Sequence, residues 1–83
     1  MNDYIVYAAF DKDSGKCLYV GSGKHDRYKH IYSGISHVYE ANRYHFQGKT
    51  PRVDIVHSYL SKKESLEIEG NLIEFLNPEW NML

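Results

Sequence analysis

Two tyrosines, an arginine and a glutamate are the residues of this 83-residue chain whose types and spacing suit catalysis. Tyr7 closes an Ile-Val-Tyr tripeptide, and Tyr19 opens a Tyr-Val-Gly tripeptide. Arg27 follows shortly afterwards, and Glu69 comes much later, on the apolar side of an expected helix. Two phenols, a cationic donor and a carboxylate are suitable groups for hydrolysing a phosphodiester with a single divalent metal ion.

Two neighbouring strands are expected to position the tyrosines. Residues 4–10 and 17–21 are rich in aromatic and β-branched side chains, and a Gly-Ser-Gly stretch is expected to end the second strand. The Asp-Lys-Asp-Ser-Gly stretch between them is typical of a turn. If the hairpin centres on Asp13, Tyr7 lies opposite Tyr19, and both rings occupy the same face of the sheet.

A short helix is expected next, from a cap at Asp26 to about Ser33. Arg27 and His30 are three residues apart in it, so they share a face.

A second helix and a third strand complete the middle of the chain. Ser36 is expected to cap the helix, which ends near Gly48. The residues expected on its inner side are Val38, Ala41, His45 and Phe46. After Pro51, alternation of larger and polar side chains predicts the strand. Its alternating members are Val53, Ile55, His57 and Tyr59.

The last helix has the clearest boundaries. Ser61 and Glu64 form a capping-box pattern, and Asn77 precedes the proline that stops the helix. The apolar stripe consists of Leu66, Ile73 and Leu76. Glu69 lies three residues after the first of these, where a hydrophobic side chain belongs. A buried lone carboxylate is costly unless a positive group meets it, which makes Glu69 a candidate site residue.

Composition narrows the class of protein. The net charge is −1, with eight Lys/Arg against three acids from Lys12 to Arg52, and two lysines against six acids from Val53 onward. This asymmetry fits a polyanion bound on one face, and equally fits ordinary scatter of solvated charges. A single cysteine, Cys17, excludes an intramolecular disulfide and suits a reducing compartment. Because signal-peptide and membrane-span patterns are both missing, we expect a cytoplasmic protein.

Taken in order, the two tripeptides, Arg27, Glu69 and the terminal Asn-Pro and Asn81 resemble the GIY-YIG endonuclease family. The resemblance extends from Tyr4 to Asn81, and the Gly-Ser-Gly and Ser-Gly-Ile-Ser-His stretches look most like the phage endonuclease II branch. The chain departs from the family in three places. Ile5 replaces the first glycine, the stretch before Arg27 is short, and the histidine follows the arginine by three residues where many members have four.

The resemblance implies an α/β fold, with a small, mainly antiparallel three-stranded sheet flanked by helices, formed by residues 1–83 as one nuclease domain. It also implies one Mg²⁺ (or Mn²⁺) per active site and cleavage of DNA by direct attack of water. The roles that it implies are metal ligand for Glu69, transition-state stabiliser for Arg27, base for Tyr7, water orientation or a shared base role for Tyr19, phosphate contact or proton relay for His30, and substrate binding for Lys24, His37 and Asn81.

Structural roles stay open for each of the main candidates. The tyrosines can be a core aromatic pair, Arg27 can pair with Asp26 or Asp54, and Glu69 can meet a buried arginine. A catalytically silent or partner-dependent module that binds DNA or protein is the alternative function. A homo-oligomer is also open, because Tyr44, Phe46 and Trp80 suit either a dimer contact or the core.

Overall fold

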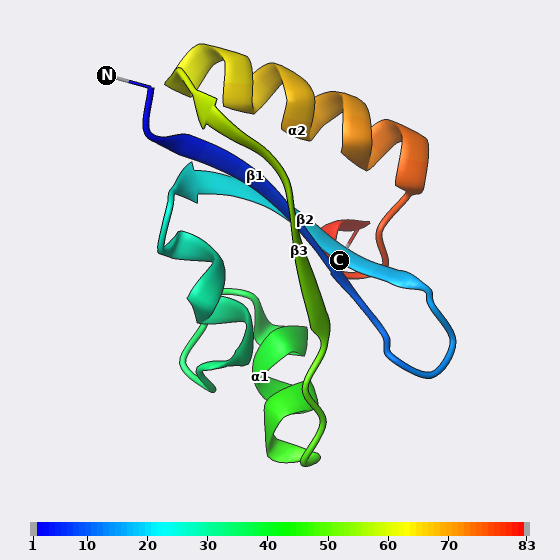
Figure 1. Ribbon diagram of the computed structural model, residues 1–83. Coiled ribbons are helices and arrows are strands. Elements are labelled where there is room, and N and C mark those ends of the chain that lie inside the picture. The colour runs from blue at the N-terminus through cyan, green and yellow to red at the C-terminus, as the bar shows by residue number, and fades with distance from the viewer. Residues whose placement is uncertain (1, 83) are drawn as a thin grey trace.

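The computed structural model describes residues 2–82, which fold as a three-stranded antiparallel sheet with helices on both faces (Figure 1). The strands are β1 (Tyr4–Phe10), β2 (Cys17–Lys24) and β3 (Arg52–Leu60), in the spatial order β2-β1-β3. The helices are α1 (Tyr39–Phe46) and α2 (Lys62–Leu76), with short 3₁₀ helices η1 (Arg27–Tyr32) and η2 (Trp80–Met82). The predicted α/β class and antiparallel sheet are therefore confirmed. Within the described residues, no helix has the length and apolar character needed to cross a bilayer.

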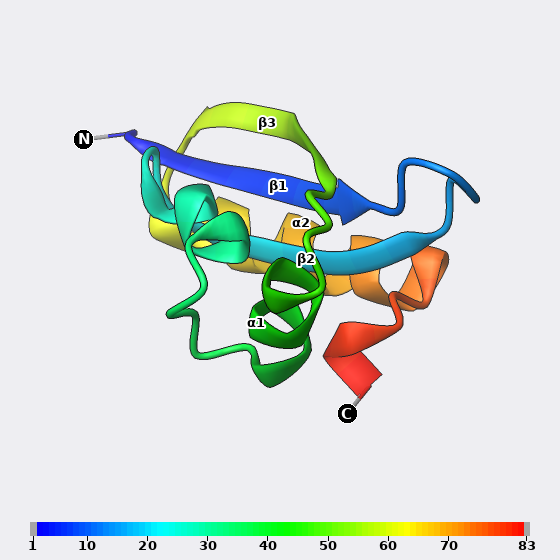
Figure 2. The same cartoon turned by 90° about the horizontal axis from the view of Figure 1, so that it is seen from below.

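The central strand, β1, is buried on both faces, which explains its apolar run without polar alternation. Ile5, Tyr7 and Ala9 pack toward η1, α1 and η2, whereas Val6 and Ala8 pack toward α2. Figure 2 shows this layering, with α2 behind the sheet and η1 and α1 in front of it. The sheet therefore separates two small cores, and Tyr7 belongs to the one under η1.

The expected pairing of the tyrosines is wrong by two residues. Tyr7 pairs with Gly21, and Tyr19 pairs with Ala9. The hairpin loop closes between Asp11 and Lys16, and the register shifts at the end of β1. Because side chains alternate with a period of two, this slip keeps both rings on the predicted face, with their centroids 6.3 Å apart.

The second strand is longer than expected. The Gly-Ser-Gly stretch continues β2 to Lys24 in antiparallel pairing with the first half of β1, so it does not end the strand. The next helix is the 3₁₀ helix η1, which begins after Asp26 as predicted, although the Asp26 side chain makes no capping hydrogen bond. Asp26 pairs instead with Lys29 at 3.7 Å.

The second helix is shorter than expected, because Ser36 is held outside it. The Ser36 backbone N–H donates to the Asn42 side chain, and its hydroxyl accepts from the Val38 N–H, so α1 begins only at Tyr39. The expected inner residues His45 and Phe46 are exposed, Phe46 by 78%.

The side chain that replaces them toward the core is Tyr44, whose ring packs against Trp80 at 5.5 Å. Trp80 is buried.

The last helix begins and ends as predicted. Ser61 accepts from the Glu64 N–H, the Glu64 carboxylate accepts from the Ser61 N–H, and Asn77 adopts a left-handed conformation at the end. The predicted stripe is partly wrong, since Leu66 is 52% exposed. The α2 residues that pack on the sheet are Ile68, Leu72, Ile73 and Leu76.

We expect Ser61→Ala to lower the free energy of unfolding by about 1 kcal/mol, because the hydrogen bond that the Ser61 hydroxyl accepts from the Glu64 N–H is lost. Urea denaturation followed by circular dichroism measures the change. Ser58→Ala, at an exposed position of β3, is the matched control and should leave the midpoint unchanged. Equal midpoints for Ser61→Ala and the native chain would show that the cap does not stabilise the fold.

Candidate functional site

Two glycines on β2 make room for the side chains of the site. A Cβ atom at Gly21 would lie 2.5 Å from the Tyr7 hydroxyl oxygen and 2.8 Å from the Tyr19 ring. A Cβ atom at Gly23 would lie 2.8 Å from Cγ of Arg27. The Tyr7 ring and the Arg27 stem therefore lie directly on the backbone of β2. This contact explains why the Tyr-Val-Gly tripeptide must end in glycine.

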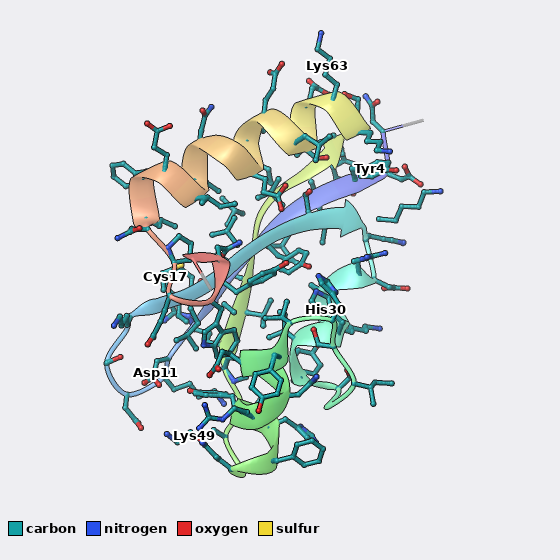
Figure 3. The ribbon with its side chains drawn as sticks, turned by 180° about the vertical axis from the view of Figure 1, so that it is seen from behind. Tyr4, Asp11, Cys17, His30, Lys49 and Lys63 are labelled. Atoms are coloured by element: carbon teal, nitrogen blue, oxygen red, sulfur yellow. The ribbon has the colours of Figure 1, made fainter. Side chains whose placement is uncertain are left out.

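A chain of hydrogen bonds connects Tyr7 to the loop before α1. The Tyr7 hydroxyl lies 2.8 Å from Nε2 of His30, and Nδ1 of His30 lies 2.5 Å from the Ser36 hydroxyl. Figure 3 shows His30 on the η1 side of the sheet. Tyr7 is 1% exposed, and His30 connects its hydroxyl to Ser36 by hydrogen bonds. Arg27 and His30 are three residues apart in the 3₁₀ helix η1, so they lie on one face of it, as predicted. His30 contacts Tyr7 from this face.

Burial sets the protonation states of this pair. It raises the pKa of Tyr7 far above its usual value, with the charges of Tyr19 and Glu69 acting in the same direction and Arg27 opposing them. Burial also lowers the pKa of His30 to about 4, assisted by His37 and Arg27. At neutral pH, the pair therefore consists of a phenol and an uncharged imidazole. Such an imidazole can accept the phenolic proton on Nε2 while Nδ1–H donates to Ser36.

The two charged candidates approach β2 from opposite faces of the sheet. The Arg27 stem lies on Gly23, and the Glu69 carboxylate, from α2, accepts a hydrogen bond of 3.1 Å from the Ser22 hydroxyl. Burial is the largest cause of the raised pKa at Tyr7 and Tyr19; the Glu69 charge acts in the same direction, and the Arg27 charge opposes it. β2 is an outer strand of the sheet.

The ion pairs considered as structural alternatives for Arg27 and Glu69 do not occur among the described residues. Asp54 pairs with Arg52 at 3.3 Å, and Arg27 forms no ion pair with any residue of the described chain. The hydrogen-bond partner of Glu69 is Ser22 and not an arginine. The pairing of Asp26 with Lys29 likewise leaves the Arg27 guanidinium available to a ligand.

A cavity of about 470 Å³ opens where β2 meets the first turn of α2. Three cationic side chains line it, namely Lys24, Arg27 and Lys62, and Ser22 connects it to the Glu69 carboxylate. Lys62 was missed by sequence reasoning, because it belongs to the acidic half of the chain. Its position directly after the capping Ser61 fixes its place beside the end of β2. The cavity suits an anion such as a phosphate group.

The remaining predicted residues, Asn81 and His37, flank Tyr19. The Asn81 amide accepts from the Val20 N–H at 2.8 Å and donates to the Val20 carbonyl at 2.9 Å, as another strand would at this free edge. Both hydrogen-bonding groups of Asn81 thus brace β2 and are engaged without a substrate. The His37 ring lies 4.8 Å from the His30 ring.

The oxygen donors of the site suit a hard cation held mostly by water and substrate. Mg²⁺ is typically bound through one or two carboxylates together with phosphate oxygens and waters. Glu69 supplies one carboxylate, and the Ser22 hydroxyl lies beside it. No group of three or more His, Cys, Asp or Glu side chains able to hold a metal occurs among residues 2–82. The donor set therefore fits Mg²⁺ bound jointly with a phosphate.

Comparisons with protein-family models, with curated proteins and with solved structures found no match to this chain. The interpretation of the site therefore depends on the geometry of its own residues.

We expect the imidazole of His30 to titrate near pH 4 in the folded chain, as measured by the pH dependence of its NMR signals. The unfolded chain binds this proton near pH 6.5, so the free energy of unfolding should fall as the pH drops from 6.5 toward 4. Urea midpoints between pH 6.5 and 5, where most carboxylates stay ionised, measure this slope. His30→Gln should flatten it, and an unchanged slope in that variant would assign the effect to other groups.

Proposed function

We propose that this protein is a metal-dependent DNA endonuclease of the GIY-YIG type. The observation that carries the proposal is the convergence on β2 of five residues: Tyr7, Tyr19 and His30 contact one another, Arg27 lies on Gly23, and Glu69 bonds to Ser22. These residues come from four separate elements and from both faces of the sheet. A core aromatic pair would need neither the imidazole acceptor nor the two opposite charges beside it.

The phosphate to be cut binds between the two charged residues. Arg27 donates to its non-bridging oxygens, where negative charge increases in the transition state. Glu69 would hold the Mg²⁺, which would supply a Lewis acid for the phosphate and for the departing oxygen. Ser22 orients the carboxylate through its hydrogen bond.

Tyr7 accepts a proton from the attacking water and passes its own phenolic proton to His30. A free tyrosinate is unfavourable here, because burial raises the pKa of Tyr7. Transfer to Nε2 of His30, at 2.8 Å, avoids that anion, and the resulting imidazolium donates to Tyr7 and Ser36. Tyr19, with its ring 6.3 Å from the Tyr7 ring, would orient the water. Protons balance, since the water loses one and the imidazole gains one.

The cationic cavity holds the neighbouring phosphates of the same strand. Lys24 and Lys62 face it together with Arg27, so a bound backbone is anchored on one side of the scissile group. Contacts of this kind give affinity without sequence selectivity.

Glu69→Gln tests the proposed chemistry. The amide keeps an acceptor for Ser22 but loses the negative charge, so we expect Mg²⁺-dependent nicking of supercoiled plasmid to fall by about 10²-fold or more. Chelation of the metal should abolish nicking by the native chain. Glu74→Gln, at an exposed position of α2, is the matched control and should cut normally. Full activity of Glu69→Gln would exclude the proposed metal site.

Lys62→Ala tests the phosphate cavity. We expect weaker binding of duplex DNA, with the slope of log affinity against log salt reduced by about 0.9, because one phosphate contact is lost. Lys63→Ala is the matched control, since Figure 3 shows Lys63 pointing away from the sheet on the outer side of α2. Equal salt-dependence slopes for Lys62→Ala and Lys63→Ala would show that the cavity does not contact DNA.

A further inference from the structure

A second pocket lies against Tyr19, away from the cationic cavity. Its volume is about 460 Å³, and its lining residues are Tyr19, His37, Val38, Tyr39, Glu40 and Trp80. Tyr19 and Gly23 lie four residues apart on β2, a distance of roughly 13 Å along a strand. The two cavities thus flank the position where the Tyr7 hydroxyl lies over Gly21.

The walls of this pocket are aromatic and largely fixed. Trp80 is 8% exposed, packs against Tyr44 and precedes the residue that brackets Val20 by two hydrogen bonds. The His37 ring packs against His30 at 4.8 Å. Tyr39, in contrast, is 72% exposed at the rim. An exposed aromatic ring such as that of Tyr39 can stack on a nucleobase, and such stacking is tolerant of sequence.

The charge of the pocket selects a base over a phosphate. Its lining contains one carboxylate, Glu40, which Arg43 holds at 3.5 Å, and contains no lysine or arginine. A carboxylate repels phosphate but accepts hydrogen bonds from the N–H groups of a base edge. The cationic cavity has the opposite preference, so a strand lying along β2 has one suitable place for its backbone and another for a base.

We propose that the Tyr19–Trp80 pocket binds an unpaired nucleobase of the nucleotide next to the scissile phosphate. This inference rests on the proposed function, and it assigns the substrate class as DNA with a displaced or unpaired base at the cutting site. Extruding a base from a duplex costs stacking and pairing energy, and the cost is smallest at mismatches, branches and single strands. Guanine is the best match to Glu40, because its ring N–H and amino N–H are parallel donors to two carboxylate oxygens.

Binding without cleavage tests the pocket separately from the nuclease. The native chain, in chelator, is titrated with a short abasic DNA strand that carries one central guanine, one central thymine or no base. Two-dimensional NMR of the ¹⁵N-labelled protein should show shifts of the Trp80 indole N–H and the Tyr39 amide with the guanine strand and not with the base-free strand. Identical shifts with the base-free strand would overturn the proposal.

Two variants with matched controls test the lining residues Tyr39 and Glu40 of the Tyr19–Trp80 pocket. Tyr39→Ala should weaken binding of the guanine strand by about fivefold or more, whereas Phe46→Ala, exposed on the same helix, should not change it. Glu40→Gln should reduce the preference for guanine over thymine, whereas Glu67→Gln, on α2, should keep it. Equal effects of Tyr39→Ala and Phe46→Ala would contradict a stacking site, and an unchanged guanine preference in Glu40→Gln would contradict base reading by Glu40.

The outcome is independent of the plasmid assay. Base-dependent shifts in a chain that cuts no DNA would support the pocket and reject the nuclease. Nicking without base-dependent shifts would support the nuclease and reject the pocket.

Discussion

The close approach of side chains to the backbone of an outer strand is the constraint on which this molecule depends. At Gly21 and Gly23 the pleat carries no Cβ atoms, so a tyrosine ring and an arginine stem lie where ordinary side chains would stand. On the opposite face, a carboxylate from α2 bonds to Ser22, which lies between these two glycines.

The charge of the neighbouring side chains changes along β2. Three cations surround the cavity at the end of β2, an uncharged tyrosine–histidine pair lies in the middle, and one carboxylate among aromatic rings lies beyond Tyr19. Burial keeps the central pair neutral, because it raises the pKa of the phenol and lowers that of the imidazole. A nucleotide strand has the complementary alternation of anionic backbone and flat bases, so the two cavities suit the two parts of the proposed substrate.

The sequence predicted the order and type of the main elements, but not all of their bounds or the contacts between them. The capping box and the Asn77 stop located α2 because both signals are local to the backbone. The register of the hairpin was not predictable, since a shift at the end of β1 moves every pair. Ser36 has the residue type of a cap, yet its contacts with His30 and Asn42 hold it outside α1. The role of Lys62 depends on a contact between distant segments, which composition alone does not reveal.

The hydrogen bonds that complete the site join segments far apart in the chain. Tyr7 and His30 are separated by 23 positions, Ser22 and Glu69 by 47, and Val20 and Asn81 by 61. Closing a large loop costs more conformational entropy than closing a small one, so long-range contacts form after local ones. The β1–β2 hairpin needs only local contacts, whereas Glu69 and Asn81 join the site through contacts across most of the chain. The proposed site is therefore complete only in the full tertiary structure.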